Sequence, residues 1–201
     1  MPRYSIKYSV KHGGELAARQ SSEVFLIEAG DVASFYWCKI SGAYVHLSLV
    51  VTHLAGDGKK RQMSLGFYPK DGAMMASLLK AQDGEIWLPD PLYNKGKPVP
   101  VLHYSKRTHI KYSITAEIAR RLNDILYSDK CAYTLEKNRL TCKIPQMYNM
   151  LSFVGKEPEL NCISWLTTVF PSLEHDMYGD NVLHRLMKPV ASVTSKVIRR
   201  I

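Results

Sequence analysis

The sequence predicts an α+β fold in which an antiparallel sheet packs against helices. Apolar and mixed side chains alternate over residues 45–52, and a tight turn and a second strand-like run follow. Two later stretches, near residues 115–126 and 161–170, repeat apolar side chains every three or four positions. A period of two indicates a strand and a period near 3.6 indicates a helix. The length of 201 residues fits a single domain over residues 1–201.

The first half of the chain is typical of strands separated by turns. The clearest strand covers residues 44–53, and Gly56-Asp57-Gly58 after it is a hairpin signal. A returning strand is expected at residues 61–68, ended by the turn at residues 69–72. Shorter strands are expected at residues 23–27 and 32–40. Residues 84–112 are rich in Pro and Gly, and we expect a long ordered loop there with one short strand at residues 99–104.

The second half is expected to be mainly helical. Thr115 is a suitable N-cap for the first helix, and Glu117 in its first turn matches the helix dipole. Residues 133–144 predict one or two strands. A second helix should begin at Asn161-Cys162 and end by Pro171. We expect a helical C-terminal tail over residues 181–201.

Charge and hydropathy limit the classes of partner. The net charge of +9 favours polyanions such as nucleic acid, anionic membranes or cell-wall polymers. The basic clusters are short, however, and the one at Lys106-Arg107 with neighbouring aromatic residues is a weak nucleic-acid signal, so we expect no clear nucleic-acid site. No apolar run is long enough to cross a membrane, and the N-terminus does not resemble a signal peptide. We expect a cytoplasmic protein in the producing cell, or one secreted by a route that needs no signal peptide.

The four cysteines give no metal-binding or disulfide pattern. Cys38, Cys131, Cys142 and Cys162 match no zinc-ligand spacing, and a domain of this size does not need disulfides. We therefore expect reduced thiols and no metal site. Phosphate-loop, dinucleotide and metalloprotease motifs are absent from the sequence, so we expect no cofactor.

Cys162 is the candidate nucleophile. Asn161 is a preferred N-cap, so Cys162 occupies the first position of the predicted helix. At that position the helix dipole and the free N–H groups stabilise a thiolate, and the same N–H groups can bind an oxyanion. A buried, unreactive cysteine is the ordinary alternative. We expect Cys162 to be alkylated faster than the other three cysteines.

His46 is the candidate base, because a cysteine nucleophile needs an imidazole within hydrogen-bonding distance. It lies on the mixed face of the best strand, where we expect it to face a cleft rather than the core. A third residue should orient the ring, and the sequence leaves several candidates: Asp31, Glu28, Glu23, Ser64 or a backbone carbonyl. A hairpin closed at Asp57-Gly58 would point Ser64 to the other face, although a shift of one residue would reverse this.

These residues, in this order, resemble a known group of proteins. Gly30-Asp31-Val32 is followed by a strand with His46, by Ser64-Leu-Gly-Phe-Tyr-Pro69, and by Asn161-Cys162 at a helix start. The pattern over about residues 23–170 is similar to the circularly permuted papain-like proteins, which include NlpC/P60 peptidases and lecithin:retinol acyltransferases, and to bacterial toxin and effector domains of that superfamily. The resemblance implies a permuted papain-like fold with Cys162 and His46 as catalytic residues. No second histidine clearly occupies the next strand, which makes lipid acyl transfer the weaker branch.

The expected function is therefore cysteine-dependent hydrolysis of an amide bond. The resemblance implies a toxin or effector that cleaves a peptidoglycan peptide or a host protein, with an immunity or host protein as a partner. The alternative is a basic binding module without catalysis that binds nucleic acid or a protein. Alkylation at one cysteine and sensitivity of binding to salt separate the two.

Overall fold

The structure is a computed structural model that describes residues 5–7, 21–41, 44–95, 98–100, 110–134, 137–152 and 158–178. The expected helical tail at residues 181–201, the basic cluster at Lys106-Arg107 and the end of the expected strand at residues 99–104 lie outside the described residues. Among those that are described, no helix is long and apolar enough to cross a membrane.

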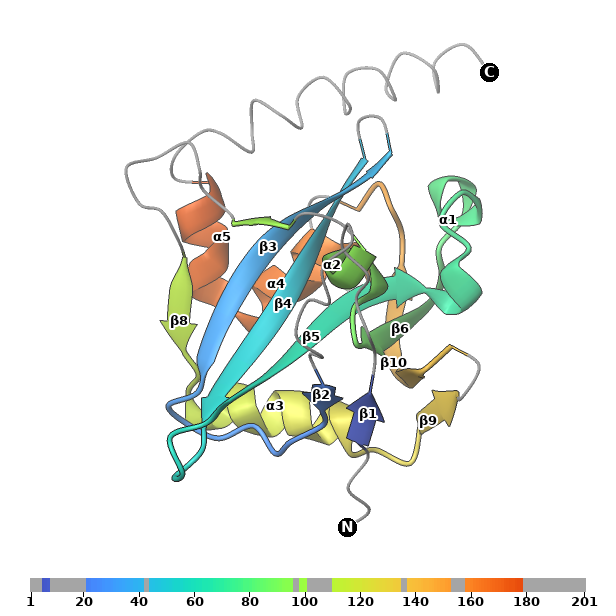
Figure 1. Ribbon diagram of the computed structural model, residues 1–201. Helices are drawn as coiled ribbons and strands as arrows, with labels where there is room; N and C mark the ends of the chain where they lie inside the picture. Colours follow the sequence, from blue (N-terminus) through green and yellow to red (C-terminus); the bar gives the residue numbers. More distant parts are fainter. Residues whose placement is uncertain are drawn as a thin grey trace, which may run out of the picture.

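The described chain forms an open, mostly antiparallel sheet with helices, which makes the fold class α+β (Figure 1). The strand order is β11-β10-β6-β5-β4-β3-β7, with β8 paired to β3 and β9 paired to β10. The strands of this sheet are β3 (Val32–Ser41), β4 (Tyr44–Leu54), β5 (Lys60–Pro69), β6 (Gln82–Leu88), β7 (Val99–Pro100), β8 (Lys111–Ser113), β9 (Cys131–Thr134), β10 (Arg139–Tyr148) and β11 (Glu159–Leu160). A separate pair joins β1 (Ser5–Lys7) to β2 (Ser21–Glu23).

Helices account for the rest of the described secondary structure. They are α1 (Ala76–Leu79), α2 (Pro91–Lys95), α3 (Ala116–Leu126), α4 (Cys162–Val169) and α5 (Pro171–Tyr178), with the 3-10 turn η1 (Lys70–Gly72) after β5. The expected cap of α3 is confirmed, because the Thr115 side chain accepts a hydrogen bond from the backbone N–H of Ile118. The expected end of the second helix is confirmed as well, since α4 ends at Val169 and Pro171 begins α5.

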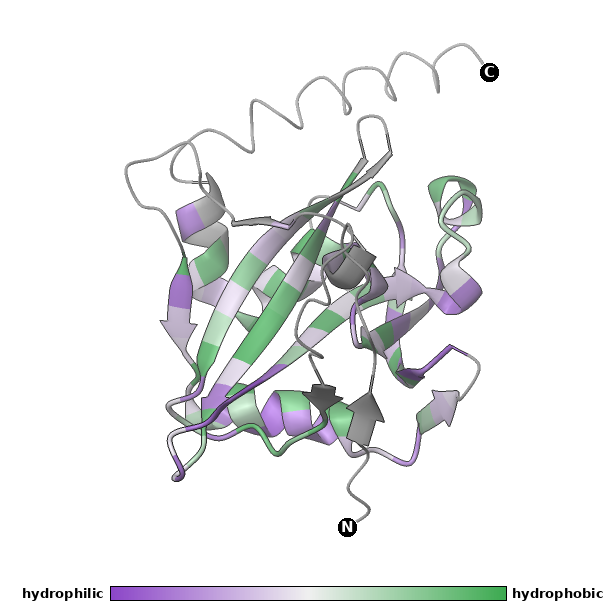
Figure 2. Cartoon of the chain, viewed as in Figure 1, coloured by the Kyte–Doolittle hydropathy of each residue, from purple (hydrophilic) through white to green (hydrophobic). Residues whose placement is uncertain are grey.

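The main core lies between one face of the sheet and helices α3 and α4. Leu47 and Leu49 of β4 and Phe67 of β5 are buried there with Trp165 of α4, and the Phe67 and Trp165 rings lie 5.8 Å apart. Alternate residues along β4 point to the opposite face. Figure 2 shows the resulting alternation of hydrophobic and more polar residues along β3 and β4. The period-two pattern over residues 45–52 therefore predicted β4 correctly, and it predicted correctly that Leu47 and Leu49 face the core.

Strands β4 and β5 separate beyond the part where they pair. They pair over Leu49–Leu54 and Lys60–Leu65, and from Gly66 onward β5 pairs with β6 instead. The first part of β4, which includes His46, stays paired with β3. Figure 1 shows this divergence, with α4 behind the two strands. The candidate site lies where the strands separate.

Three expectations about secondary structure are wrong. Much of the stretch expected to be a loop at residues 84–112 has regular secondary structure instead: it contains all of α2 and β7 and most of β6 and β8. The strand expected at residues 23–27 is found at Ser21–Glu23, and residues 24–28 have no regular structure although Phe25 and Ile27 are buried. The hairpin is also shifted by one residue, because Val50 is opposite Ser64. Ser64 therefore shares a face with His46.

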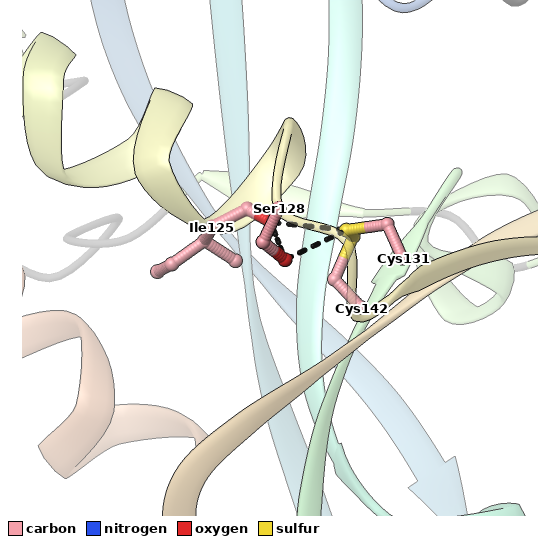
Figure 3. The surroundings of a disulfide bond; sticks show 4 residues. All are labelled: Ile125, Ser128, Cys131 and Cys142. Atoms are coloured by element: carbon pink, nitrogen blue, oxygen red, sulfur yellow. Dashed lines mark hydrogen bonds between the residues drawn. A yellow bond between two sulfur atoms is a disulfide. The ribbon is translucent and has the colours of Figure 1, made fainter.

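The expectation that all four thiols are reduced is also wrong. Cys131 of β9 and Cys142 of β10 are directly opposite in the antiparallel register and form a disulfide (Figure 3). Ser128, between α3 and β9, lies beside the bond, with its hydroxyl 3.6 Å from Cys131 Sγ. The spacing of 11 residues is not informative by itself, since it is the pairing of β9 with β10 that brings the two sulfur atoms together. Cys38 and Cys162 are the free cysteines of the described chain.

Candidate functional site

His46 lies in a fully buried polar cluster at the start of β4. Its Nε2 is 2.9 Å from Oδ2 of Asp90, and both side chains are 0% exposed. The expectation that His46 faces an open cleft is therefore wrong. A hollow of about 270 Å³ is lined instead by residues of the β6 and β10 region such as Gly84 and Lys143.

Asp90 follows β6 and receives hydrogen bonds on both carboxylate oxygens. Oδ2 accepts from His46 and from the Ser48 hydroxyl. Oδ1 accepts from the Tyr68 hydroxyl at 2.6 Å, and from the backbone N–H groups of Leu92 at 2.9 Å and Tyr93 at 3.3 Å at the start of α2. So many donors fix the orientation of the carboxylate, and they favour its charged form.

The electrostatics of the pair follow from this arrangement. Burial opposes charge on Asp90, but His46 and the hydroxyls of Ser48 and Tyr68 outweigh it and lower the Asp90 pKa to about 2. Burial likewise opposes charge on His46, yet the Asp90 carboxylate and then the Cys162 side chain raise the His46 pKa to about 10. Each group therefore favours the charged form of the other.

Cys162 lies at the first position of α4, as expected. The Asn161 side chain accepts hydrogen bonds from the N–H groups of Ile163 and Ser164, both at 2.9 Å, and the Ser164 hydroxyl accepts from the N–H of Asn161 at 2.7 Å. This capping box fixes the helix start. It does not use the N–H of Cys162 itself. The ordinary alternative is right about burial, because Cys162 is only 5% exposed.

The structure brings Cys162 and His46 together. Cys162 is close enough to the imidazole to be one of the causes that raise the pKa of His46. Nδ1 of His46 is buried, and within the described part of the chain it has no hydrogen bond of good geometry. Since Nε2 is bonded to Asp90, Nδ1 is the ring nitrogen left to exchange a proton with a thiol.

Tyr148 and Cys38 complete the surroundings of the thiol. Burial, and then the charge and hydrogen bonding of Cys162, raise the pKa of Tyr148 well above its usual value, so this phenol keeps its proton. Cys38 is opposite His46 in the β3–β4 register, and its sulfur is 3.4 Å from the Ser48 hydroxyl. Burial raises the pKa of Cys38 to about 12, which leaves almost no thiolate at neutral pH.

Among the candidates for the third residue whose side chains the structure describes, Asp31, Glu28 and Ser64, no hydrogen bond to His46 is found. Asp31 bonds a different imidazole, with Oδ1 2.7 Å from Nδ1 of His53, and the Glu28 backbone N–H donates to Asp31 Oδ2. Ser64 is near the site, but its hydroxyl accepts from the backbone N–H of Asp90 at 3.1 Å. The side chain of Glu23 lies outside the described residues. The residue that sequence reasoning missed is Asp90.

A local signal at Asp90 could have been used. Asp90 is followed directly by Pro91, and an aspartate N-cap before a proline at the first helical position is a typical helix start. That signal predicts α2 and a carboxylate at its beginning. It does not predict contact with His46, which lies 44 positions earlier.

Among the described residues, no group of three or more His, Cys, Asp or Glu side chains is arranged to hold a metal ion. Comparisons of the chain with protein-family models, with curated proteins and with solved structures found no match.

Proposed function

We propose that the protein is a cysteine-dependent hydrolase of amide bonds, with Cys162 as nucleophile, His46 as proton carrier and Asp90 as the group that orients His46. One observation carries the proposal: the imidazole of His46 is bonded through Nε2 to a buried carboxylate, and its Nδ1 has no hydrogen bond within the described chain. The neighbouring cysteine, which is one cause of the raised His46 pKa, lies at the start of a capped helix. A cysteine nucleophile needs these elements: a base, an orienting group, and N–H donors at the helix start.

The chemical step follows from these positions. The Cys162 thiolate attacks the carbonyl carbon of the substrate, forming an S–C bond, and the oxyanion is stabilised by the N–H of Cys162, which the cap leaves free. The C–N bond then breaks, and the His46 imidazolium gives its proton to the departing amine. Water attacks the thioester while His46 accepts a proton from it, and the acid product and the Cys162 thiolate are released.

The role of Asp90 is to hold the imidazole and to support its positive charge. With Nε2 donating to Oδ2 of Asp90, the ring can present only Nδ1 to the sulfur. An anionic partner favours the imidazolium, which in turn favours the thiolate. The Tyr148 hydroxyl, which keeps its proton and interacts with Cys162, supplies a further donor beside the sulfur.

The proposed substrate is a peptide amide in peptidoglycan or in a host protein, and the proposed setting is a bacterial toxin or effector of permuted papain-like fold. Support for the setting comes from the order of the Asp31, His46 and Asn161-Cys162 motifs in the sequence. The net charge of +9 suits a polyanionic cell-wall polymer. An immunity or host protein remains part of this proposal.

Alkylation tests the nucleophile without a known substrate. Cys38 is a matched control, because both free cysteines are buried, at 2% and 5% exposure. We expect iodoacetamide at about pH 6 to modify Cys162 well before Cys38, as measured by peptide mass spectrometry, because the pKa of Cys38 is raised to about 12. Equal rates, or a faster Cys38, would contradict the assignment.

Activity against muropeptides and unfolded proteins tests the reaction. We expect Cys162→Ala and His46→Gln each to remove nearly all hydrolysis, and the double variant to be no worse than either, because each residue is useless without the other. Additive losses, or full activity of His46→Gln, would exclude the dyad. If activity persists in Cys162→Ala, the nucleophile lies elsewhere.

A further inference from the structure

Four side chains from four neighbouring strands form a continuous stack that begins at His46. The His46 ring stacks on Tyr68 of β5, with ring centres 4.6 Å apart and planes at 26°. Tyr68 stacks on Trp87 of β6 at 4.3 Å and 14°. The guanidinium carbon of Arg139 on β10 lies 3.3 Å from the centre of the Trp87 ring.

Tyr68 is the member of this stack that touches both halves of the His46–Asp90 pair. Its ring covers one face of the imidazole, and its hydroxyl donates to Asp90 Oδ1 at 2.6 Å. Asp90 Oδ2 is then the oxygen directed to His46. Burial, and then Asp90, raise the pKa of Tyr68 above its usual value, so the hydroxyl remains a donor throughout the working pH range.

The remaining members keep Tyr68 in place. Trp87 covers the outer side of Tyr68 and is itself fixed, since its Nε1 donates to Glu85 at 2.9 Å. The Arg139 guanidinium lies over Trp87, where a cation over an indole face is attracted to it. Its Nε is buried without a hydrogen bond within the described chain, and the charge of Glu85 favours the guanidinium cation there as well. A tyrosine packed between two rings has little freedom to rotate its hydroxyl away from Asp90.

The sequence makes room for this contact at Gly66. A Cβ at Gly66 would lie 2.5 Å from Tyr68 Cε2 and 2.9 Å from Asp90 Cγ, which are distances that atoms do not tolerate. Only glycine therefore allows Tyr68 and Asp90 to meet at this point. The space at Gly66 indicates that the contact between the hydroxyl and the carboxylate is built into the fold.

We propose that Tyr68, supported by Trp87 and Arg139, is a positioning residue that fixes the Asp90 carboxylate and the His46 ring for proton transfer. The inference rests on the proposed function, because it concerns the same cysteine site. Tyr68 takes no part in bond making. It keeps Asp90 charged to lower pH and in the one orientation that favours the imidazolium beside Cys162.

The consequence appears in the dependence of the Cys162 alkylation rate on pH, on its acid limb, where the rate falls as the pH is lowered. When Asp90 is protonated, the buried imidazolium loses its counter-charge and returns its proton to the thiolate, so alkylation slows. Tyr68→Phe keeps the ring but removes one of the donors that stabilise the carboxylate. A hydrogen bond to a charged group corresponds to about one pKa unit or more. We expect the acid limb to move up by about one pH unit, which is about a tenfold slower reaction at a fixed pH on that limb.

The test is the rate of Cys162 alkylation by iodoacetamide between about pH 1 and pH 8, a range that includes the low pH at which Asp90 takes up its proton, with unfolding measured for each variant at each pH. Tyr112→Phe is the matched control, because Tyr112 also donates its hydroxyl to a carboxylate, that of Asp176, outside the His46 cluster. We expect its acid limb to match the wild type. A purely structural role for Tyr68 would lower the melting temperature without moving the acid limb.

The outcomes separate the two proposals. If wild-type Cys162 reacts no faster than Cys38, the proposed function fails and the positioning role fails with it. If Cys162 is selectively reactive and Tyr68→Phe has an unchanged acid limb, the positioning role alone is overturned. Should Tyr68→Phe not fold, Trp87→Phe replaces the indole but leaves the Tyr68 hydroxyl. We expect Trp87→Phe to move the acid limb to higher pH by less than Tyr68→Phe would. An unchanged acid limb in Trp87→Phe would then overturn the proposal.

Discussion

His46 and His53 both lie on β4, and each bonds an aspartate from a distant part of the chain. His46 meets Asp90 at 2.9 Å with both side chains 0% exposed. His53 meets Asp31 at 2.7 Å with side chains that are 19% and 6% exposed. The two pairs are alike in distance and chemistry, so a histidine–aspartate bond alone does not identify a catalytic site.

The difference lies in the other neighbours of each ring. Beside His46 are the Cys162 side chain and the stacked Tyr68 ring. Beside His53 is the ring of Phe25, with the two ring centres 5.5 Å apart. His46 also uses Nε2 for its carboxylate and leaves Nδ1 unbonded, while His53 uses Nδ1. The proposed base needs a free nitrogen and a neighbouring thiol, and of these two histidines it is His46 that has an unbonded Nδ1 and Cys162 beside it.

The largest difference between the pairs should appear when each histidine is removed. His46→Ala leaves a buried, unpaired Asp90 charge, and breaking such a pair costs about 3–5 kcal/mol. His53→Ala should cost about 1 kcal/mol, because this ring is partly exposed and water can reach the site. Urea unfolding measures both losses.

Cys162 alkylation on the same two variants sharpens the comparison. We expect selective reactivity to be lost in His46→Ala and kept in His53→Ala. His46→Gln, which retains a donor for Asp90, serves if His46→Ala does not fold. Equal losses of reactivity in the His46 and His53 variants would show that the two pairs are not functionally different.

A smaller effect is expected from filling the space at Gly66. Gly66→Ala would push the new methyl group against Tyr68 and Asp90, and overpacking of a buried site costs about 1–3 kcal/mol. Gly56→Ala is the control, since nothing lies within 4 Å of its added Cβ, and its effect should stay within about 0.5 kcal/mol. Gly66→Ala should also slow Cys162 alkylation, whereas the His53–Asp31 pair should be unaffected. A neutral Gly66→Ala would mean that the Asp90 contacts are not tightly constrained.

The sequence predicted the parts of the site that depend on local pattern. Alternation placed His46 on a strand, and the Asn161 cap placed Cys162 at a helix start, because both signals lie within a few residues of the position concerned. It also led to errors about burial. Alternation was interpreted as one buried face and one mixed face, but His46 and Ser48 on the mixed face are buried as well.

The parts that could not be predicted depend on pairing between distant segments. Asp90 reaches His46 because β6 pairs with the end of β5, and residues 84–112 were interpreted as a loop, so no strand was available to carry it there. Ser64 was assigned to the wrong face by a shift of one residue, which reverses every side chain of a strand. The Cys131–Cys142 disulfide likewise depends on the pairing of β9 with β10.

The smallest effect at neutral pH, and the last test of the comparison, is the dependence of stability on pH. The His46 pKa rises on folding from 6.5 to about 10, so its contribution is fully present below about pH 6.5 and is lost as the pH rises through about 10. The Asp90 pKa falls on folding from 3.8 to about 2, so its contribution is present above about pH 3.8 and is lost as the pH falls through about 2. Both contributions are therefore complete between about pH 4 and pH 6.5.

Melting temperatures measured from pH 2 to pH 10.5 isolate these contributions when variants are compared with the wild type. His53→Ala keeps the His46–Asp90 pair, so we expect its melting temperature to retain the fall toward pH 10 that the wild type shows. His46→Gln should lie furthest below the wild type between about pH 4 and pH 6.5, and the gap should narrow toward pH 10 as the wild type loses its imidazolium. A gap that stays constant up to pH 10 would mean that His46 is not charged in the folded protein. The resting site would then be a neutral imidazole beside a thiol, and His46 would have to take the proton from Cys162 during the attack.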